Sequence, residues 1–438
     1  PCAGDKGNIM FSKWQWLFIR FTHKLWVRAA LFAVMAIVTA LIAAPVERLL
    51  PDALSFQISV ATIDQILDIL ATSMLTVTTF SLGVMVSAFT AASTGTTPRA
   101  TQLVREDPIT QNVLATFLGA FLFSLVGIIA LNTGVYGEGG RLVLFAATLL
   151  VIGIILVAIL HWIEHLSVLG RVTETTDQVE VAAANALRAR VEHPHLGARC
   201  LPEDWQRPAN GFDIKSESTG YICHIDIASL QETADELKLK INVLLTPGSF
   251  VFPGKPLACV EFKEKEVLNS EQEAHLINRV TSAYTTGKTR SFEQDPRFGL
   301  IVLSEIASRA LSPAVNDPGT AIDVLGRAVR LFCIWRDHRV LGDDDESICF
   351  PSVRVPALKT SDLIEDLFMP VARDGAGLIE IQIRVQKSMA ALGDMAPEAY
   401  SDVMAHYAAL AVKRASQSLA LEEEVEQLKA VQCERKRR

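Results

Sequence analysis

Four long runs without a charged side chain constrain the fold of this chain more than any other feature. They cover residues 29–46, 69–98, 108–137 and 142–163. A helix needs about 20 apolar residues to cross a hydrocarbon core of about 30 Å, and in lipid a helix satisfies its own backbone hydrogen bonds. The sequence therefore predicts four transmembrane helices, near residues 28–48, 67–92, 112–133 and 142–163.

Charge divides the chain into two unlike halves. Residues 1–165 carry nine basic and nine acidic side chains, whereas residues 166–438 carry 32 basic and 40 acidic ones. This distribution excludes a wholly soluble enzyme, a disordered chain and a disulfide scaffold. It also argues against a nucleic-acid partner, because neither half is strongly basic. We expect an α-helical membrane domain followed by an ordinary charged globular region.

Basic residues beside the predicted spans indicate the orientation of the chain. Lys13, Arg20, Lys24 and Arg28 precede the first span, and Arg99 and Arg105 lie between the second and third. Loops rich in Lys and Arg remain on the cytoplasmic side of a membrane. Both termini are therefore predicted to be cytoplasmic.

The second predicted span contains a stripe of small and hydroxyl side chains. Their spacing of three and four residues puts them on one face of a helix. Such a stripe is typical of tight helix packing, in which hydroxyls bond across the interface. The alternative is a pore lining, which requires a homo-oligomer with these stripes around a common axis. The pore-lining candidates are Thr72, Thr76, Thr79, Gly83, Ser87 and Thr90.

An H-x-x-E-H string lies at the end of the fourth predicted span. His161 and His165 are one helical turn apart and Glu164 lies beside them, an arrangement known from zinc peptidases. The alternative is a pair of interfacial histidines next to a solvated carboxylate. The string is short and lies at a lipid boundary, so we expect no metal and no cofactor, and enzymatic activity is the less favoured function.

The second half of the chain has a mixed pattern. Residues 166–192 look helical, which predicts a stalk that continues the fourth span. Alternating apolar residues and two Pro-Gly turns in 211–263 predict a small β module, whose PGSFV and GKPL strings are similar to the turn of biotinyl- and lipoyl-type barrel domains. No acceptor lysine stands at a hairpin tip, so we interpret the module as an adaptor barrel. Residues 264–438 read as a helical α+β domain whose last helix could form a short coiled coil.

Polar residues concentrate between positions 290 and 320. Asp317 and Pro318 have the pattern of a helix N-cap followed by its first residue. The polar residues of this segment could gather into a ligand site, or they could serve as caps and ion pairs. The candidates are Arg290, Asp295, Arg297, Glu305, Asn316 and Asp317.

Three strings together resemble one family, the DUF2254 predicted membrane proteins of bacteria. They are Thr97-Pro98-Arg99, the PGSFV and GKPL turn, and RSFEQDPRFGL followed by ALSPAVNDPGTA within 290–321. The resemblance extends from Met10 to about residue 430. This chain has Gly95 where the family form has Gln. The resemblance implies a bacterial inner membrane and four spans, and it implies no established activity.

These observations give a five-part prediction. A cytoplasmic segment (1–27) precedes a four-helix transmembrane domain (28–165), a helical stalk and linker (166–210), the β module (211–263) and the helical domain (264–438). The leading hypothesis is a homo-oligomeric pore or channel with a cytoplasmic vestibule. The first alternative is a membrane-anchored scaffold or sensor that binds a small ligand, ion or partner through residues 290–320. The second alternative is a metalloenzyme that uses the H-x-x-E-H string.

Overall fold

The structure, a computed structural model, describes residues 27, 30, 34, 38, 59–105, 107–133, 138–262, 269–338 and 348–437. The chain divides into two compact units between residues 175 and 176. We call them the membrane unit and the globular unit, and each is considered by itself. The predicted N-terminal segment (1–27) and first span (28–48) lie outside the described residues, apart from four helical positions: Val27, Ala30, Val34 and Val38.

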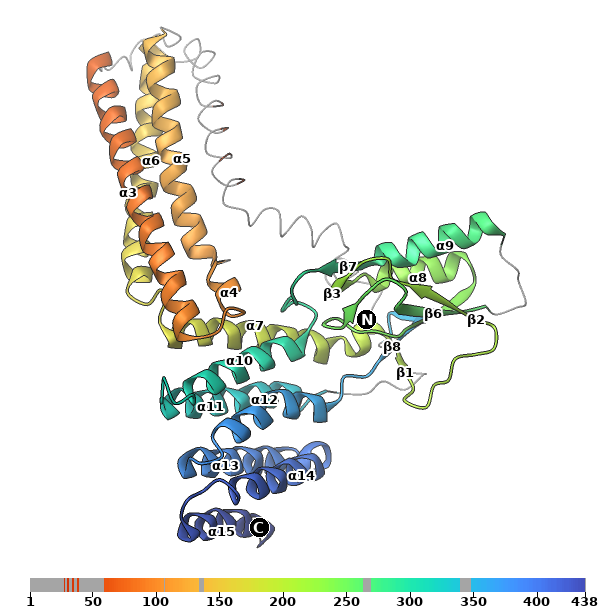
Figure 1. Cartoon of the computed structure of the whole chain (residues 1–438). Coiled ribbons are helices and arrows are strands. Elements are labelled where there is room, and N and C mark those ends of the chain that lie inside the picture. The colour runs from red at the N-terminus through yellow and green to blue at the C-terminus, as the bar shows by residue number, and fades with distance from the viewer. Residues whose placement is uncertain are drawn as a thin grey trace. The chain divides into compact units, whose positions relative to one another are not determined.

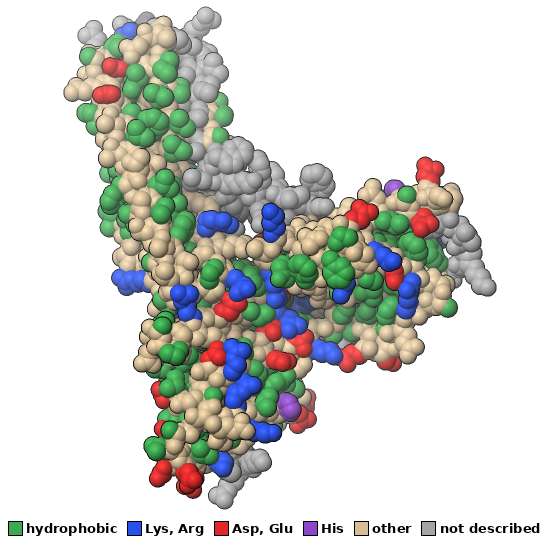
Figure 2. Space-filling view, in the orientation of Figure 1, with side chains coloured by type: hydrophobic (Ala, Val, Ile, Leu, Met, Phe, Trp, Pro, Cys, Tyr) green, Lys and Arg blue, Asp and Glu red, His purple; other side chains and the backbone are tan. Residues whose placement is uncertain are grey.

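Three described helices are long and apolar enough to cross a membrane, and all three belong to the membrane unit. They correspond to the second, third and fourth predicted spans. On the face shown in Figure 2, hydrophobic side chains run along these helices, and the charged side chains of the described residues lie toward the helix ends. The helices of this unit are α3 (Val60–Gly95), α4 (Thr101–Arg105), α5 (Pro108–Asn132) and α6 (Glu138–Leu166).

Helix α5 is the centre of the membrane unit. It packs along both α3 and α6, which contact each other much less. Figure 1 shows the three helices side by side. The three helices share one core of almost fully buried side chains. It includes Ile63 and Leu67 of α3, Phe117 and Phe123 of α5, and Leu144 of α6. This helix begins at an Asp-Pro pair, because the Asp107 carboxylate accepts a 2.7 Å hydrogen bond from the Thr110 backbone nitrogen and Pro108 needs no partner there.

The predicted stalk is not continuous with the fourth span. Helix α6 ends at Leu166, a turn follows, and α7 (Val172–Glu192) starts anew. Gly170 adopts φ +82° in this turn, and a Cβ there would lie 3.0 Å from the backbone of Ala88. The close approach of two backbones and the left-handed conformation both require glycine. Sequence periodicity did not reveal this break because the apolar pattern runs through it.

The globular unit contains two open sheets. In the five-stranded sheet the order is β1-β8-β4-β6-β2, with β8 parallel to both of its neighbours and the remaining pairs antiparallel. The three-stranded sheet has the order β5-β3-β7 and is antiparallel. The strands are β1 (Ala198–Leu201), β2 (Gly211–Lys215), β3 (Gly220–Ile225), β4 (Leu239–Val243), β5 (Phe250–Val251), β6 (Pro256–Phe262), β7 (Tyr284–Gly287) and β8 (Phe350–Pro356).

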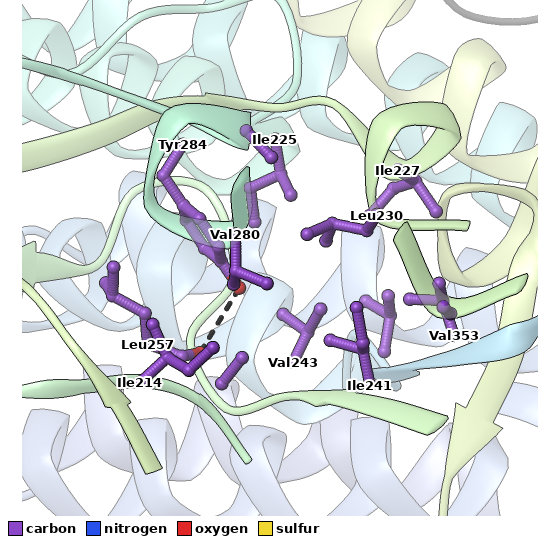
Figure 3. Close-up of a cluster of buried hydrophobic side chains, with 14 of the residues drawn as sticks. Ile214, Ile225, Ile227, Leu230, Ile241, Val243, Leu257, Val280, Tyr284 and Val353 are labelled. Carbon is purple, nitrogen blue, oxygen red and sulfur yellow. Dashed lines mark hydrogen bonds between the residues drawn. The ribbon is translucent and has the colours of Figure 1, made fainter. Parts of the chain in front are cut away.

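The barrel-like form expected for the β module is therefore wrong for the described residues. Strands β1, β7 and β8 come from outside residues 211–263 and complete the two sheets. Side chains of both sheets and two helices, α8 (Ile227–Glu236) and α9 (Ser270–Ala283), share one apolar core (Figure 3). Within that core the Tyr284 hydroxyl donates a 3.2 Å hydrogen bond to the Leu257 carbonyl oxygen.

The rest of the globular unit is helical. Phe332, Phe368 and Tyr400 join three helices of this part in one buried aromatic cluster, with ring centroids 5.9 to 6.0 Å apart. The predicted coiled-coil residue Leu428 is instead buried against Val412 and Ala415 of the same chain. These helices are η2 (Pro194–Gly197), α10 (Pro296–Ala310), α11 (Pro318–Trp335), α12 (Thr360–Asp374), α13 (Ile379–Met395), α14 (Pro397–Ala415) and α15 (Glu422–Arg437).

Two contacts attach α7 to these helices. The Arg327 side chain of α11 is 4% exposed and contacts Asp177, Glu180 and Asp323, while Arg330 donates to Glu180 from an exposed position. Helix α10 also approaches α7 closely at a glycine.

A Cβ on Gly299 of α10 would lie 2.5 Å from the Cβ of Ala183 in α7. Charge pairing and close backbone contact therefore both hold α7 within the globular unit.

Candidate functional site

The Ser/Thr/Gly stripe of α3 lies opposite the packed face of that helix. At about 100° per residue, the stripe and the buried residues are centred about 180° apart around the helix axis. The buried face holds Ile63, Leu67, Ala71, Met74, Ser81, Ala88 and Ala92. The six candidates Thr72, Thr76, Thr79, Gly83, Ser87 and Thr90 are all exposed. Packing against the described helices of the same chain does not account for the stripe.

The exposed surface of α3 has a second, different part. Large apolar side chains flank the stripe, among them Phe80, which is 66% exposed, and Ile69, which is 58% exposed. The described chain leaves room for a larger side chain at position 83, because a Cβ on Gly83 would meet no atom within 4 Å. The stripe from Thr72 to Thr90 extends for about 27 Å at 1.5 Å per residue, close to the thickness of a hydrocarbon core.

Hydroxyl groups of the stripe bond to the preceding turn of the helix. Thr76 donates to the Thr72 carbonyl oxygen at 2.9 Å, and Thr90 donates to the Val86 carbonyl oxygen at 3.0 Å. Thr79 and Ser87 do the same. Each hydroxyl has one hydrogen and two lone pairs, so these bonds use the donor and leave acceptors on the helix surface. The stripe therefore presents oxygen acceptors, the ligand type that alkali cations prefer.

The H-x-x-E-H string does not converge on one point. His165 is buried, and its Nε2 lies 3.0 Å from the Asp107 carboxylate and 3.1 Å from the Thr110 hydroxyl. His161 and Glu164 are exposed, and the Nδ1 of His161 lies 2.9 Å from the Val157 carbonyl oxygen. His165 thus joins the start of α5 to the end of α6.

A metal site would need at least three ligands close together. Among the residues that the structure describes, no group of three or more His, Cys, Asp and Glu side chains is close enough to hold a metal ion.

Two of the three strings that carry the family resemblance meet at a buried ion pair. The Arg290 guanidinium donates to both carboxylate oxygens of Asp295, at 2.7 and 3.0 Å, and Asp295 also caps α10 through the Phe298 backbone nitrogen. Gly248 of the PGSFV turn closes over this pair, since a Cβ there would lie 2.3 Å from Asp295. Burial raises the pKa of Asp295, and its bonds to Arg290 oppose that effect.

The other candidates of the 290–320 segment lie elsewhere. Arg297 binds two acids of α12, with 2.6 Å to Asp366 and 2.9 Å to Asp362, and the bonds to Asp366 raise the pKa of Arg297. Glu305 is half-buried in the middle of α10.

Asn316 and Asp317 are exposed beyond the far end of α10, about 22 Å from its start. Asp317 caps α11, as predicted, by accepting from the Thr320 backbone nitrogen at 3.1 Å. The segment therefore supplies caps and ion pairs at separate places, and the structure does not bring its six candidates together.

Sequence reasoning did not reveal a cluster of three buried or partly buried basic side chains next to Asp295. Arg190 of α7 donates to the Gln294 carbonyl oxygen at 3.2 Å, and burial lowers its pKa to about 10. His195, 1% exposed with φ 53°, and His338 lie close enough to influence each other electrostatically. Burial lowers the pKa of each histidine to about 4. The three residues come from three segments, so no local pattern could have revealed the cluster.

Comparisons with known proteins identify sequence relatives and a family but no matching structure. Uncharacterized proteins of Mycobacterium tuberculosis and Mycobacterium bovis are 24% identical to the chain over 277 residues, which is 63% of this chain and 52% of each relative. The chain thus spans about half the length of the curated relatives it matches. No solved structure matches the chain. Residues 22–391 match the family described as predicted membrane protein DUF2254, and the chain therefore belongs to that family of membrane proteins.

Proposed function

We propose that this membrane protein assembles as a homo-oligomer in which the α3 stripes of several copies line a pore for cations. The observation that carries the proposal is the position of the stripe, which faces away from the core of the membrane unit along its whole length. A single copy offers one such helix among the described residues, so a closed lining needs further copies.

Three environments are possible for the stripe, and they differ in what they require. A helix face in contact with lipid usually carries large apolar side chains. Helix α3 has such side chains, including Ile69 and Phe80, beside the stripe. Helix packing between copies uses small side chains and does not need water. A pore needs polar acceptors continuously across the membrane. The length of the stripe and its unused hydroxyl lone pairs support the pore.

The acidic residues at the start of α3 support cations over anions. Asp68 precedes Thr72 by one turn, is exposed, and lies within about 60° of the stripe centre around the helix. In an oligomer it would form a ring of carboxylates at one end of the lining, and such rings attract cations.

The contacts within residues 290–320 give less support to the alternative of a ligand sensor. Arg290, Asp295 and Arg297 are engaged in bidentate ion pairs inside the globular unit. A bound ligand would have to replace these bonds.

The test is cation flux into liposomes that contain the purified protein. Thr79→Leu and Gly83→Leu place bulk on the stripe without touching the described core, and we expect both to lower flux strongly. Ser73→Leu and Ala91→Leu are the matched controls, because they place the same leucine side chain on the exposed flank, about 80° away from the stripe.

The oligomeric state of every variant is measured in parallel. Flux lost with the oligomer intact supports a pore. Dissociation of the oligomer would assign the stripe to packing between copies, and unchanged flux in both stripe variants would refute the pore.

A further inference from the structure

One turn of the globular unit exposes two neighbouring aromatic side chains. Phe250 is 50% exposed and Phe252 is 49% exposed. Among the described residues of this unit, no other Phe, Tyr or Trp is exposed. Lys255 completes the turn, with its Nζ 5.6 Å from the centre of the Phe252 ring. We call residues 250–255 the aromatic tip.

The fold holds the aromatic tip in a defined conformation. Val251 is fully buried in the core shared by the two sheets, and because side chains alternate along a strand, its neighbours Phe250 and Phe252 point outward. The Phe250 ring rests edge-on against Tyr221, with centroids 5.1 Å apart. Two backbone hydrogen bonds anchor the tip to Ser216. The Gly254 nitrogen donates to the Ser216 carbonyl oxygen at 2.9 Å, and the Ser216 nitrogen donates to the Lys255 carbonyl oxygen at 2.8 Å. Exposure of these rings is therefore built into the strand and is not the result of a loose loop.

Three lysines surround the tip, although the second half of the chain is acidic. Lys215 ends β2 beside the tip, and Lys288 follows Gly287, which pairs with Tyr221. The tip and its neighbouring strands and turns comprise residues 215–221, 246–256 and 284–289. These segments contain three basic side chains, Lys215, Lys255 and Lys288, and one acidic side chain, Glu217. Residues 166–438 have 32 basic and 40 acidic side chains. The charge at the tip is thus opposite to that of the surrounding half.

We propose that the aromatic tip docks on the headgroup region of an anionic lipid bilayer. Aromatic rings partition to the interface between headgroups and acyl chains, and nearby lysines are attracted to anionic headgroups. The chain carries its own membrane helices, so a bilayer is present at a high effective concentration for every part of the globular unit. This proposal is independent of the pore, since it requires only that the protein is in a membrane.

The experiment uses the full chain in nanodiscs and an environment-sensitive fluorescent amino acid at position 253. Pro253 is exposed and lies between the Phe252 ring and Lys255 in the sequence. Its backbone nitrogen donates no hydrogen bond, so replacing it breaks none. The same amino acid at Val315, which is 49% exposed in another loop of the same unit, is the control. Emission is compared between nanodiscs of phosphatidylcholine alone and nanodiscs that also contain phosphatidylglycerol.

We expect blue-shifted emission from position 253 in the anionic nanodiscs, and no dependence on lipid at position 315. Lys215→Gln with Lys255→Gln should lower the ratio of docked to undocked protein by roughly 30-fold, because each lysine near an anionic surface contributes about a factor of five. Both lysines lie at the protein surface, so their replacement leaves the core intact. Phe250→Ser with Phe252→Ser should abolish the shift.

Two outcomes would overturn the proposal. Water-like emission from position 253 in both kinds of nanodisc would show that the tip does not reach the bilayer. Blue-shifted emission that is the same in both nanodiscs and in detergent would show that protein, such as a second copy, covers the tip.

Discussion

Replacing Asp295 with Ala tests whether the 290–320 segment is a structural element. The substitution removes the carboxylate that pairs with the half-buried guanidinium of Arg290, and it takes a counter-charge from the buried Arg190. Loss of one partner of a buried ion pair costs about 3–5 kcal/mol. Loss of the cap of α10 adds about 1 kcal/mol. Asp295→Ala should therefore lower the free energy of unfolding of the globular unit by about 4–6 kcal/mol.

A matched substitution isolates the ion pair from the cap. Asp317→Ala removes the same kind of helix start, an Asp followed by Pro, but Asp317 is exposed and pairs with Thr320. We expect it to cost about 1 kcal/mol. Thermal unfolding of the full chain, followed by tryptophan fluorescence, measures both, since Trp335 is buried in this unit. The expected loss for Asp295→Ala is about 10–20 °C in Tm.

A double-mutant cycle supplies the refutation. If Arg290 and Asp295 interact directly, the double variant with Arg290→Met should recover about 1–3 kcal/mol relative to the sum of the single variants. Additive effects, or a loss at Asp295 no larger than at Asp317, would contradict the structural role. A ligand that raised the Tm of the native protein and failed to do so in Asp295→Asn would return the segment to the candidate sites.

Three further predictions concern stability. Arg327→Met should lower the free energy of unfolding by about 1.5–3 kcal/mol, because Asp177 and Asp323 lose a charged partner while Glu180 keeps Arg330. Arg330→Met on the same helix, 59% exposed, should cost under about 1 kcal/mol in the same melting assay. Gly299→Ala should lower the free energy of unfolding by about 1–3 kcal/mol, because the added Cβ overpacks the contact with α7. Gly326→Ala should raise it by up to about 1 kcal/mol, because a Cβ there meets nothing within 4 Å and alanine favours the helix. Because burial lowers the pKa of His195 from 6.5 to about 4 in the folded chain, the unfolded chain binds the proton first, and this histidine alone should decrease stability by on the order of 3 kcal/mol as pH falls from about 6.5 to 4. Burial lowers the pKa of His338 in the same way, so His195→Gln should reduce the slope and leave the part that comes from His338.

The helix starts were the part of the globular unit most open to prediction. An Asp at the N-cap and a Pro in the first turn satisfy local rules, and the Asp-Pro pair at 317–318 begins α11 as expected. The same pair begins α5 at 107–108 and α10 at 295–296. Asp295 was predicted as a site candidate because it is one of several polar residues between positions 290 and 320, and such a group looks the same in the sequence whether its members bind a ligand or each other.

The sheets were harder to predict because their pairing is not local. Strand β8 pairs in parallel with β4 and β1, more than 100 residues earlier in the chain, and such pairing leaves no turn signal in the sequence. The four-residue strand β7 lies within a stretch that was predicted to be helical, because sheet pairing outweighs local propensity there. The pattern within residues 211–263 therefore predicts a β module but not the pairing of its strands with β1, β7 and β8.

For α3 the sequence predicted the stripe but not its surroundings. Periodicity places Thr72, Thr76 and Thr79 on one face, yet the same period describes a buried seam and an exposed one. The structure distinguishes them, because the seam against α5 is formed by residues such as Ile63 and Leu67 on the opposite face. The family strings around Asp295 are engaged in holding the globular unit together, whereas α3 presents a continuous row of hydroxyl acceptors on an exposed face. The search for activity therefore begins with flux through the membrane and not with ligands of residues 290–320.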